Sequence, residues 1–346
     1  MRKSILVTGG AGYIGSHTCK ALDRAGYQPV VYDDLSNGHR EAVRWGPLVQ
    51  GDVRDADALN RAMRDHAVVG VVHFAGLIEV GRSMVRPDLF WDHNLNGVMA
   101  VLTAMRAAAV PRLVFSSTAA VYGAPVEGLE PLSEGAVLCP INPYGDSKLA
   151  GERLIAASCS AFGMEAVALR YFNAAGADSD GELGEAHWPE THLIPLAIEA
   201  AIGDAGALTI FGNDFPTPDG SCVRDYIHVA DLARAHVLAL AAPSAPGGFE
   251  ALNLGTGLGA SVLEVVEAVA RACEQRPPVI TGDRRVGDPP MLVADASQAQ
   301  TRLGWAPEVS SLQAIVDSAV AWRRAARFGP AALAPASKPV ALAAVA

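Results

Sequence analysis

The chain has 346 residues, of which 50% are hydrophobic and 18% are charged, enough for one large domain or two closely packed ones. Its net charge of −10 at pH 7 argues against a nucleic-acid partner, because such partners bind basic surfaces. No apolar run is long enough to span a membrane, and the basic N-terminus leads into a glycine loop, so we expect a cytoplasmic protein without membrane contact.

Short apolar runs alternate with helical patterns in the first half of the chain. The predicted strands are Ser4–Thr8, Gln28–Tyr32, Val68–Phe74, Arg112–Ser116 and Glu165–Tyr171. The predicted helices between them are Gly12–Ala25, Asp55–Asp65, Asn94–Ala109 and Pro143–Phe162. Strands that alternate with helices of this length indicate an α/β fold with a doubly wound parallel sheet of the Rossmann type.

The last third mixes short strands with helices, which are predicted for Leu193–Ile202, Ser261–Cys273 and Leu312–Arg323. From Phe328 the sequence is rich in Ala and Pro, which is typical of a disordered or loosely docked tail. We therefore expect residues 1–175 to form mainly the doubly wound domain. Residues 176–327 should form mainly a smaller mixed α/β domain, partly interleaved with the first, and residues 328–346 the tail.

The five cysteines are scattered along the chain. None forms a CxxC motif or a cluster with histidine. We therefore expect reduced packing thiols and no metal site.

A glycine-rich loop follows the first predicted strand, with Gly9, Gly12 and Gly15 in a GxxGxxG spacing. The next helix offers free backbone N–H groups and its positive dipole end to a pyrophosphate. Alone the motif is weak, but the second strand ends in Asp33 and Asp34, at the distance where a carboxylate binds the adenosine ribose. A carboxylate there repels a 2′-phosphate, so the sequence predicts NAD in preference to NADP.

Two further strand ends should complete the cofactor site. Asp52 follows Val49 at the end of a third strand and is predicted to meet the adenine. Phe74, Ala75 and Gly76 close the fourth strand, where small residues leave room for the cofactor.

Tyr144 and Lys148 stand four residues apart, after Asn142 and Pro143, which are predicted to be the N-cap and the first residue of a helix. Residues i and i+4 share one helix face, so the phenol and the ammonium can meet at one site. A nearby ammonium and the helix dipole both favour the phenolate, so we expect the tyrosine pKa to be lowered from its usual value of about 10. The pair therefore indicates a tyrosine base.

The fifth strand leads into Ser116, Ser117 and Thr118. Ligands of doubly wound sheets lie beyond the carboxyl ends of the strands, which places the Thr118 hydroxyl near the cofactor and Tyr144. Alone, Thr118 would indicate only a turn cap. With the Tyr–Lys pair and the glycine loop, it gives the constellation of the short-chain dehydrogenase/reductase superfamily.

From Ile5 to about Trp305 the chain resembles the UDP-glucose 4-epimerases, which are extended members of that superfamily. The motifs that carry the resemblance are TGGAGYIGSHT (8–18), DDLSNG (33–38), HFAGL (73–77), FSSTAAVYG (115–123), INPYGDSK (141–148), LRYFNAAGAD (169–178), DGSCVRDYIHV (219–229), NLGTG (253–257) and RVGD (285–288).

The resemblance implies an oxidation and a reduction of the sugar with one bound NAD. Tyr144 would take the proton of the sugar 4-hydroxyl as hydride leaves, and the 4-keto sugar would turn over before hydride returns. Lys148 would also hold the nicotinamide ribose, and Thr118 would bind the reacting oxygen. The expected cofactor-binding residues are Gly9, Gly12, Tyr13, Ile14, Gly15, Asp33, Asp34, Ser36, Asn37, Gly38, Asp52, Val53, Phe74, Ala75, Gly76, His93, Tyr144, Lys148 and Phe172.

The resemblance also implies a UDP-sugar site in the last third. Arg224 and Arg285 match the positions that bind the diphosphate, a task suited to guanidinium groups, although surface ion pairing is the usual role of an arginine. Asn173 matches a sugar and phosphate contact, Asp288 a uridine ribose contact, and Leu193 a uracil contact. A homodimer joined by helices at one edge of the sheet is implied as well.

Three positions depart from the commonest bacterial pattern: Ile78, His93 and Leu292 stand where lysine, asparagine and tyrosine are usual. The neutral ring of His93 can replace the asparagine's hydrogen bond to NAD, or it can be a packed histidine. Leu292, Ile78 and the segment GELGEAHWPETHLIP (181–195) resemble epimerases of the rhizobial exopolysaccharide type and the UDP-arabinose 4-epimerases. The resemblance as a whole implies interconversion of UDP-galactose and UDP-glucose. The alternatives are a UDP-xylose/UDP-arabinose 4-epimerase or an epimerase with a broader sugar scope, which is our hypothesis for Leu292 and Ile78.

Two other functions share much of this pattern. Nucleotide-sugar 4,6-dehydratases and UDP-glucuronate decarboxylases need an extra acid directly after the catalytic Ser or Thr, whereas Thr118 is followed by Ala119 and Ala120. A non-catalytic NAD-binding module usually loses the Tyr or the Lys, and this chain keeps both.

Overall fold

The structure, a computed structural model, describes residues 2–124, 130–242, 247–285 and 288–330. Residues 286–287 of the RVGD motif and residues 331–346 of the expected tail lie outside the described ranges.

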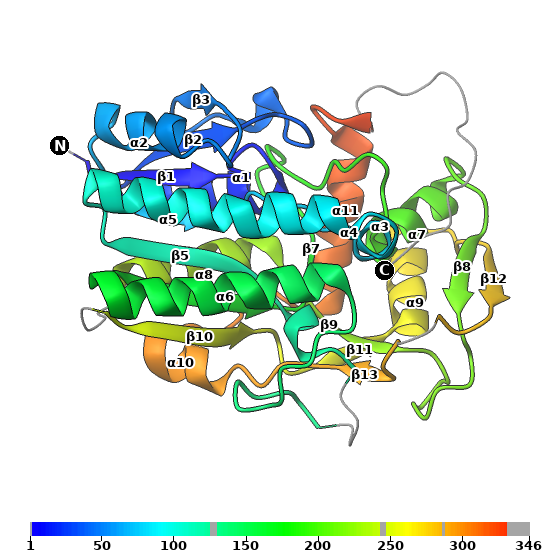
Figure 1. Ribbon diagram of the computed structural model, residues 1–346. Helices are drawn as coiled ribbons and strands as arrows, with labels where there is room; N and C mark the ends of the chain where they lie inside the picture. The colour runs from blue at the N-terminus through cyan, green and yellow to red at the C-terminus, as the bar shows by residue number, and fades with distance from the viewer. Residues whose placement is uncertain (1, 125–129, 243–246, 286–287, 331–346) are drawn as a thin grey trace.

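A seven-stranded sheet forms the centre of the molecule, with the strand order β10-β6-β5-β4-β1-β2-β3 and all neighbours parallel (Figure 1). Its strands are β1 (Ser4–Thr8), β2 (Gln28–Asp33), β3 (Leu48–Gln50), β4 (Val68–His73), β5 (Arg112–Thr118), β6 (Glu165–Tyr171) and β10 (Phe249–Leu254). The predicted α/β class and doubly wound parallel sheet are therefore confirmed.

Helices cover both faces of this sheet, because alternate strand residues such as Leu6 and Val7 are buried on opposite sides. One face carries α2 (Ala56–Asp65), α5 (Asn96–Ala108) and α6 (Pro143–Phe162). The other carries α1 (Tyr13–Arg24), α8 (Val229–Ala241) and α10 (Ser297–Leu303). The predicted helices of the first half are present, with ends that shift by at most two residues.

The second half of the chain contributes to this large sheet as well as to a smaller unit. Strand β10 pairs with β6, and α8 packs beside α1, so the two halves are interleaved. The smaller unit is built on β9 (Val223–His228), which pairs with β7 (Asn173–Ala175), β11 (Gly259–Ser261) and β13 (Met291–Leu292). A separate pair joins β8 (Leu208–Phe211) to β12 (Val279–Gly282).

Three helices of the second half form the core of this smaller unit: α7 (Leu193–Ile202), α9 (Val262–Cys273) and α11 (Leu312–Ala325). Ser261 begins α9 with a capping box, in which its side chain accepts from the Glu264 N–H and the Glu264 carboxylate accepts in return. Short helical segments complete the described fold: η1 (Arg40–Ala42), α3 (Val80–Val85), α4 (Pro87–Phe90), η2 (Trp91–Leu95) and η3 (Ala119–Tyr122).

The chain directly after α11 is packed at Phe328, the residue from which the tail was expected. Phe328 is only 7% exposed and its ring lies 5.0 Å from that of Trp322. The aromatic side chain can bury more apolar surface than the Ala and Pro residues around it, which explains the difference.

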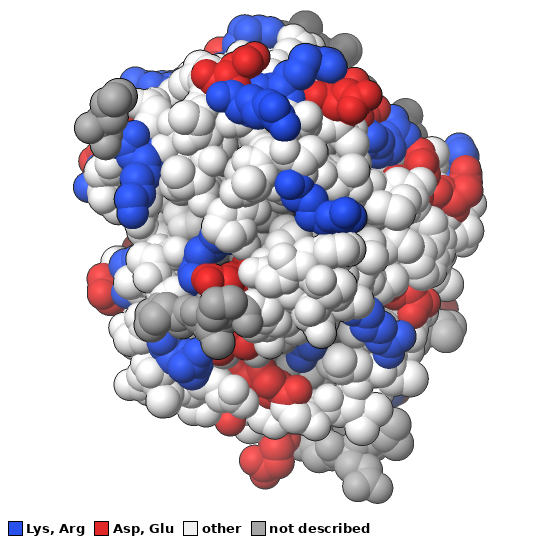
Figure 2. All heavy atoms as spheres, turned by 60° about the vertical axis from the view of Figure 1, so that its left-hand side comes forward, with Lys and Arg blue, Asp and Glu red and all other residues white. Residues whose placement is uncertain are grey.

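Charged side chains are interspersed on the face drawn in Figure 2, where basic and acidic residues alternate between wide uncharged areas. Among the described helices, none combines the length and apolar character that crossing a membrane requires.

Candidate functional site

A cleft of about 660 Å³ opens at the carboxyl ends of the central strands and continues between α7, β8 and β9. Every residue that the sequence assigned to the cofactor or the substrate lines this cleft. The parallel strands bring the motifs together, because their carboxyl ends meet at one edge of the sheet.

The glycine loop packs so closely against neighbouring backbone that a side chain at Gly9 or Gly15 would collide with it. Gly9 has a φ of +71°, and a Cβ there would lie 2.7 Å from the Ala75 nitrogen. A Cβ on Gly15 would lie 2.2 Å from the Gly9 oxygen. Helix α1 starts at Tyr13 without a side-chain cap, so its first N–H groups face the cleft as an anion site.

Asp33 ties the glycine loop to the end of β2. Its carboxylate accepts hydrogen bonds from the N–H groups of Ala11 and Leu35, both at 2.9 Å. Burial raises its pKa, and these two hydrogen bonds oppose the shift. Asp34 accepts from the Ser36 N–H and also lines the cleft.

Asp52, which follows β3 and lines the cleft, is held in place by the neighbouring Arg54. The hydrogen bonds from Arg54 lower the pKa of Asp52 to about 2, so the carboxylate is ionised at neutral pH. Val53 beside it packs against Gly97 at the start of α5.

Tyr144 and Lys148 occupy the first two turns of α6, as predicted. Asn142 caps the helix by accepting from the Gly145 N–H at 2.8 Å, and Pro143 is the first helical residue. The Lys148 ammonium donates to the Ser116 carbonyl at 3.0 Å, which fixes it below the cleft.

Thr118 caps a turn and also contacts Tyr144. Its hydroxyl accepts from the Ala120 N–H at 3.1 Å and so caps η3. Its side chain also interacts with the Tyr144 hydroxyl, which lowers the tyrosine pKa.

The expected direction of the Tyr144 pKa is wrong for this structure. Burial raises the pKa of Tyr144 more than the contact with Thr118 lowers it. Burial also lowers the pKa of Lys148 to about 8, against the opposing charge of Glu152. Both groups are thus driven toward their neutral forms, because the cleft floor removes them from water.

Glu152 on α6 and Arg170 on β6 form a buried ion pair that sequence reasoning missed. Arg170 donates to both carboxylate oxygens at 2.9 and 2.6 Å, and Ser117 donates to the same group. Glu152 lies one turn after Lys148, so the i, i+4 spacing from Lys148 was the available signal.

His93 belongs to a five-residue π-helical segment, η2, between α4 and α5, where a regular helix start was predicted. Its neighbour Asn94 holds this turn by accepting from the Leu77 N–H at 2.8 Å and donating to Ser147. Insertions of this kind are frequent at functional sites.

Buried polar atoms that line the cleft test whether a dinucleotide fits. Among the described residues, His93 Nδ1 and Glu79 Oε2 are buried without a hydrogen-bond partner, and both residues line the cleft. Such atoms normally have a partner, which a bound polar ligand would supply here. With the uncapped helix α1 and its glycine loop, these residues fit NAD.

The two arginines of the last third meet at Asp288. Arg285 binds its carboxylate at 2.8 Å and stacks on Phe211 at 4.8 Å, while Arg224 approaches the same carboxylate at 3.8 Å. Arg224 lies opposite Leu292 in the β9–β13 register. This end of the cleft therefore places two guanidinium groups side by side.

The segment before α7 contributes a further group of ionisable side chains to the cleft wall. Glu185 contacts both His187 and His192, and these contacts hold its pKa at about 2 against the effect of burial. The charges of Glu185 and Glu190 raise the pKa of His192 well above its usual value, although burial opposes them.

The chain matches known proteins over most of its length. Residues 5–255 match the NAD dependent epimerase/dehydratase family. A UDP-glucose 4-epimerase of Rhizobium meliloti (strain 1021) is 48% identical over 92% of this chain and 96% of its own length.

Two solved structures show the same fold. UDP-glucose 4-epimerase from Brucella ovis in complex with NAD has a TM-score of 0.88 at 48% identity, covering 92% of this chain and 98% of that one. UDP-glucose-4-epimerase from Stenotrophomonas maltophila, with bound NAD and formylated UDP-arabinopyranose, has a TM-score of 0.89 at 40% identity, covering 94% and 98%. The chain therefore belongs to the NAD-dependent epimerase/dehydratase family.

Proposed function

We propose that this protein is an NAD-dependent UDP-glucose 4-epimerase, an isomerase that interconverts UDP-galactose and UDP-glucose. The observation that carries this function is one cleft that joins Tyr144, Lys148 and Thr118 at its floor to Arg224 and Arg285 at its far end. The relatives of this length and identity bear the same name.

NAD is proposed to bind along the glycine loop and the ends of β2 and β4. The first N–H groups of α1 would bind its pyrophosphate, Asp33 or Asp34 its adenosine ribose, and Lys148 its nicotinamide ribose. When bound, NAD supplies the hydride acceptor and a positive charge close to the cleft floor.

Tyr144 is proposed to hold and return the proton of the sugar 4-hydroxyl at its phenolic oxygen. In the structure burial keeps this group protonated, so a nearby positive charge is needed to shift its pKa toward the working range. Thr118 would orient the sugar oxygen, and the Lys148 ammonium, held by the Ser116 carbonyl, would stabilise the phenolate. Removal of the proton and of hydride gives a 4-keto sugar, whose reduction from the other face completes the inversion.

The UDP part of the substrate is proposed to bind where Arg224 and Arg285 converge. Two forked guanidinium groups suit a diphosphate, and both arginines line the cleft. Asp288 would accept the uridine ribose hydroxyls, Leu193 would contact uracil, and Asn173 the sugar. This assignment divides the chain by function near residue 175, with NAD bound mainly before it and the UDP-sugar mainly after it.

Broader sugar scope is the second candidate, favoured by Leu292. Its side chain lines the cleft and packs against the buried cluster that includes Phe172 and Ala294, and it is smaller than a tyrosine would be. The relative from Stenotrophomonas maltophila holds a pentose nucleotide.

A substrate panel separates these two functions. We expect interconversion of UDP-galactose with UDP-glucose and also of UDP-xylose with UDP-arabinose, measured as product ratios by chromatography. Use of the hexose pair alone, with UDP-xylose and UDP-N-acetylgalactosamine untouched, would contradict the broad scope but not the epimerase. No conversion of any UDP-sugar, without NADH absorbance, would favour a non-catalytic NAD-binding module.

A homodimer is also proposed, joined through the face of α5 and α6. Met99 on α5 and Phe162 on α6 are 50% and 52% exposed, so both helices present apolar side chains that a partner could cover. Light scattering after gel filtration should give a molar mass of twice that of the chain. Met99→Glu should reduce the measured mass to that of a single chain. A cytoplasmic location is proposed because all five cysteines are free.

A further inference from the structure

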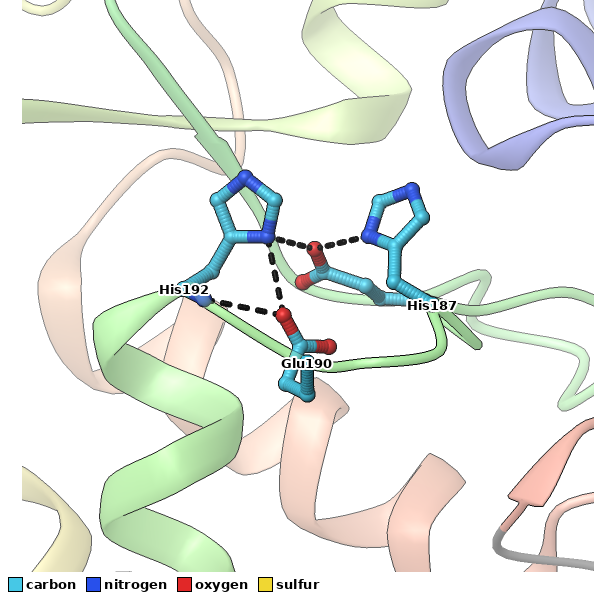
Figure 3. A group of neighbouring side chains, drawn as sticks. His187, Glu190 and His192 are labelled. Carbon is cyan, nitrogen blue, oxygen red and sulfur yellow. Dashed lines mark hydrogen bonds and ion pairs between the residues drawn. The ribbon is translucent and has the colours of Figure 1, made fainter. Parts of the chain in front are cut away.

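Four side chains with metal-ligating atoms converge in the segment before α7. One ligand atom each of Glu185, His187, Glu190 and His192 lies within 4.8 Å of all the others. Figure 3 shows the rings of His187 and His192 side by side, with their contacts running to carboxylate oxygens and their Nε2 atoms pointing away from them. We propose that these four residues bind a divalent transition-metal ion, with zinc as the best match.

The ligand set and its spacing fit zinc. Two imidazole nitrogens and two carboxylate oxygens are ordinary zinc ligands, and bonds of about 2.0–2.2 Å in a tetrahedron separate ligand atoms by about 3.3–3.5 Å. The contacts in the structure are 3.0 Å from His187 to Glu185, 2.8 Å from His192 to Glu185 and 2.9 Å from His192 to Glu190. A shift of about half an ångström in each contact would admit the ion.

The charge of the cluster also calls for a cation. Within the described residues, the ion partners of Glu185 and Glu190 are the two histidines, with no lysine or arginine among them. With a metal bound, both imidazoles would be neutral ligands, so the two carboxylates would give the site a charge of −2, which one divalent ion balances. In the metal-free protein, protons on the Nδ1 atoms bridge the same contacts.

A neighbouring acidic cluster shows what a filled site looks like. Asp178, Asp180 and Glu182 also converge, but the Lys20 ammonium lies among them at 2.7–2.8 Å. That cluster therefore has its own cation. Because it lies on the same segment as the proposed zinc site, it provides a matched control for it.

The position of the proposed metal gives it a structural task. The ring of His187 lies edge-on to that of Tyr13 at the start of α1, at 6.1 Å, and His192 directly precedes α7. A bound ion would therefore hold the wall of the cleft between Tyr13 and Leu193. Sequence reasoning missed the group, because the spacing Glu-x-His-x-x-Glu-x-His lacks cysteine and matches no common zinc motif.

Zinc titration of the chelator-treated full-length protein tests the proposal. We expect one zinc ion per chain by calorimetry and by elemental analysis after dialysis. Cobalt(II) in its place should give the visible absorption of a tetrahedral site. Zinc should also raise the melting temperature, since it binds the folded state. Less than stoichiometric binding in the wild-type chain would overturn the proposal.

Variants locate the ion. His187→Asn and Glu185→Gln should each weaken zinc binding at least tenfold, because each removes a ligand or its charge. Asp180→Asn, in the cluster filled by Lys20, should bind zinc as the wild type does. Equal zinc affinity in the wild type and in both ligand variants would place the ion elsewhere and refute this site.

Discussion

The two ends of the cleft hold their ionisable side chains in opposite ways. On the floor built by the large sheet, burial raises the pKa of Tyr144 and lowers that of Lys148 to about 8. At the UDP end, Arg285 and Asp288 form an ion pair at 2.8 Å, with Arg224 beside them. Burial at the floor thus favours the neutral forms of Tyr144 and Lys148, whereas the UDP end holds side chains that are charged.

The difference matches the two tasks that a sugar epimerase must perform. Burial brings the pKa of Lys148 toward neutral pH and keeps Tyr144 protonated. A charged ligand nearby can therefore change the protonation state of these groups, which allows a proton to be exchanged at the floor. A diphosphate needs permanent positive charge in a fixed position, which two arginines supply. Substitutions at the floor should therefore alter turnover, and those at the far end should alter substrate binding.

The largest expected effect is that of Tyr144→Phe. Loss of the phenolic oxygen removes the acid/base group, so kcat should fall by roughly 10²–10⁴-fold. The fold and the bound NAD should persist, because the ring still packs edge-on to Phe90. A coupled assay with UDP-galactose measures this, and near-normal turnover would rule out Tyr144 as the base.

Arg285→Ala tests the other end of the cleft. Charged hydrogen bonds contribute about 1.5–3 kcal/mol, so the KM for UDP-galactose should rise by roughly 10–100-fold with a smaller change in kcat. The matched control is Arg284→Ala, because Arg284 pairs with Asp214 outside the cleft lining. Equal KM values for the two variants would remove Arg285 from the substrate site.

The buried histidine at the end of β4 should also make the protein sensitive to acid. Burial lowers the pKa of His73 from 6.5 to about 3, so the unfolded chain binds a proton that the folded protein excludes. Stability should therefore fall as the pH drops below 6.5, by about 2 kcal/mol at pH 5 from this residue. His73→Gln should flatten the dependence of the melting temperature on pH between 6.5 and 5, whatever its effect at neutral pH; an unchanged slope would contradict the assignment.

The smallest expected effect is a change in sugar specificity, through Leu292 in the part of the cleft between the floor and the UDP end. Leu292→Tyr narrows the cleft and should lower the use of UDP-N-acetylgalactosamine relative to UDP-galactose by about 10-fold, a typical discrimination for a change in pocket size. Leu292→Met, which keeps the apolar volume, should leave the ratio unchanged. A ratio that is the same in all three proteins would mean that Leu292 does not set the scope.

Local patterns predicted the structure of the cleft floor well, because its residues stand on regular elements with short-range signals. The GxxGxxG loop, the Asn142 cap and the Tyr144–Lys148 spacing all lie within a few residues of the structure that they specify. The interleaving of β10 and α8 with the first half needed contacts between residues far apart in sequence, such as Leu252 with Leu169.

Interactions between distant segments also explain what was missed at the site. The Glu152–Arg170 pair joins α6 to β6, and the direction of the Tyr144 pKa depends on burial that no spacing reveals. The Arg285–Asp288 contact with Arg224 requires the β9–β13 pairing. The sequence assigned these residues to one cleft only through resemblance to a family.

The central claim is that C4 of the sugar is oxidised and reduced again within one cleft. UDP-galactose that carries deuterium at C4 tests it most directly, with the product analysed by mass spectrometry and NMR. The account predicts UDP-glucose that retains the deuterium at C4. Product that has exchanged this deuterium for solvent hydrogen, or a dehydrated sugar in place of UDP-glucose, would contradict it.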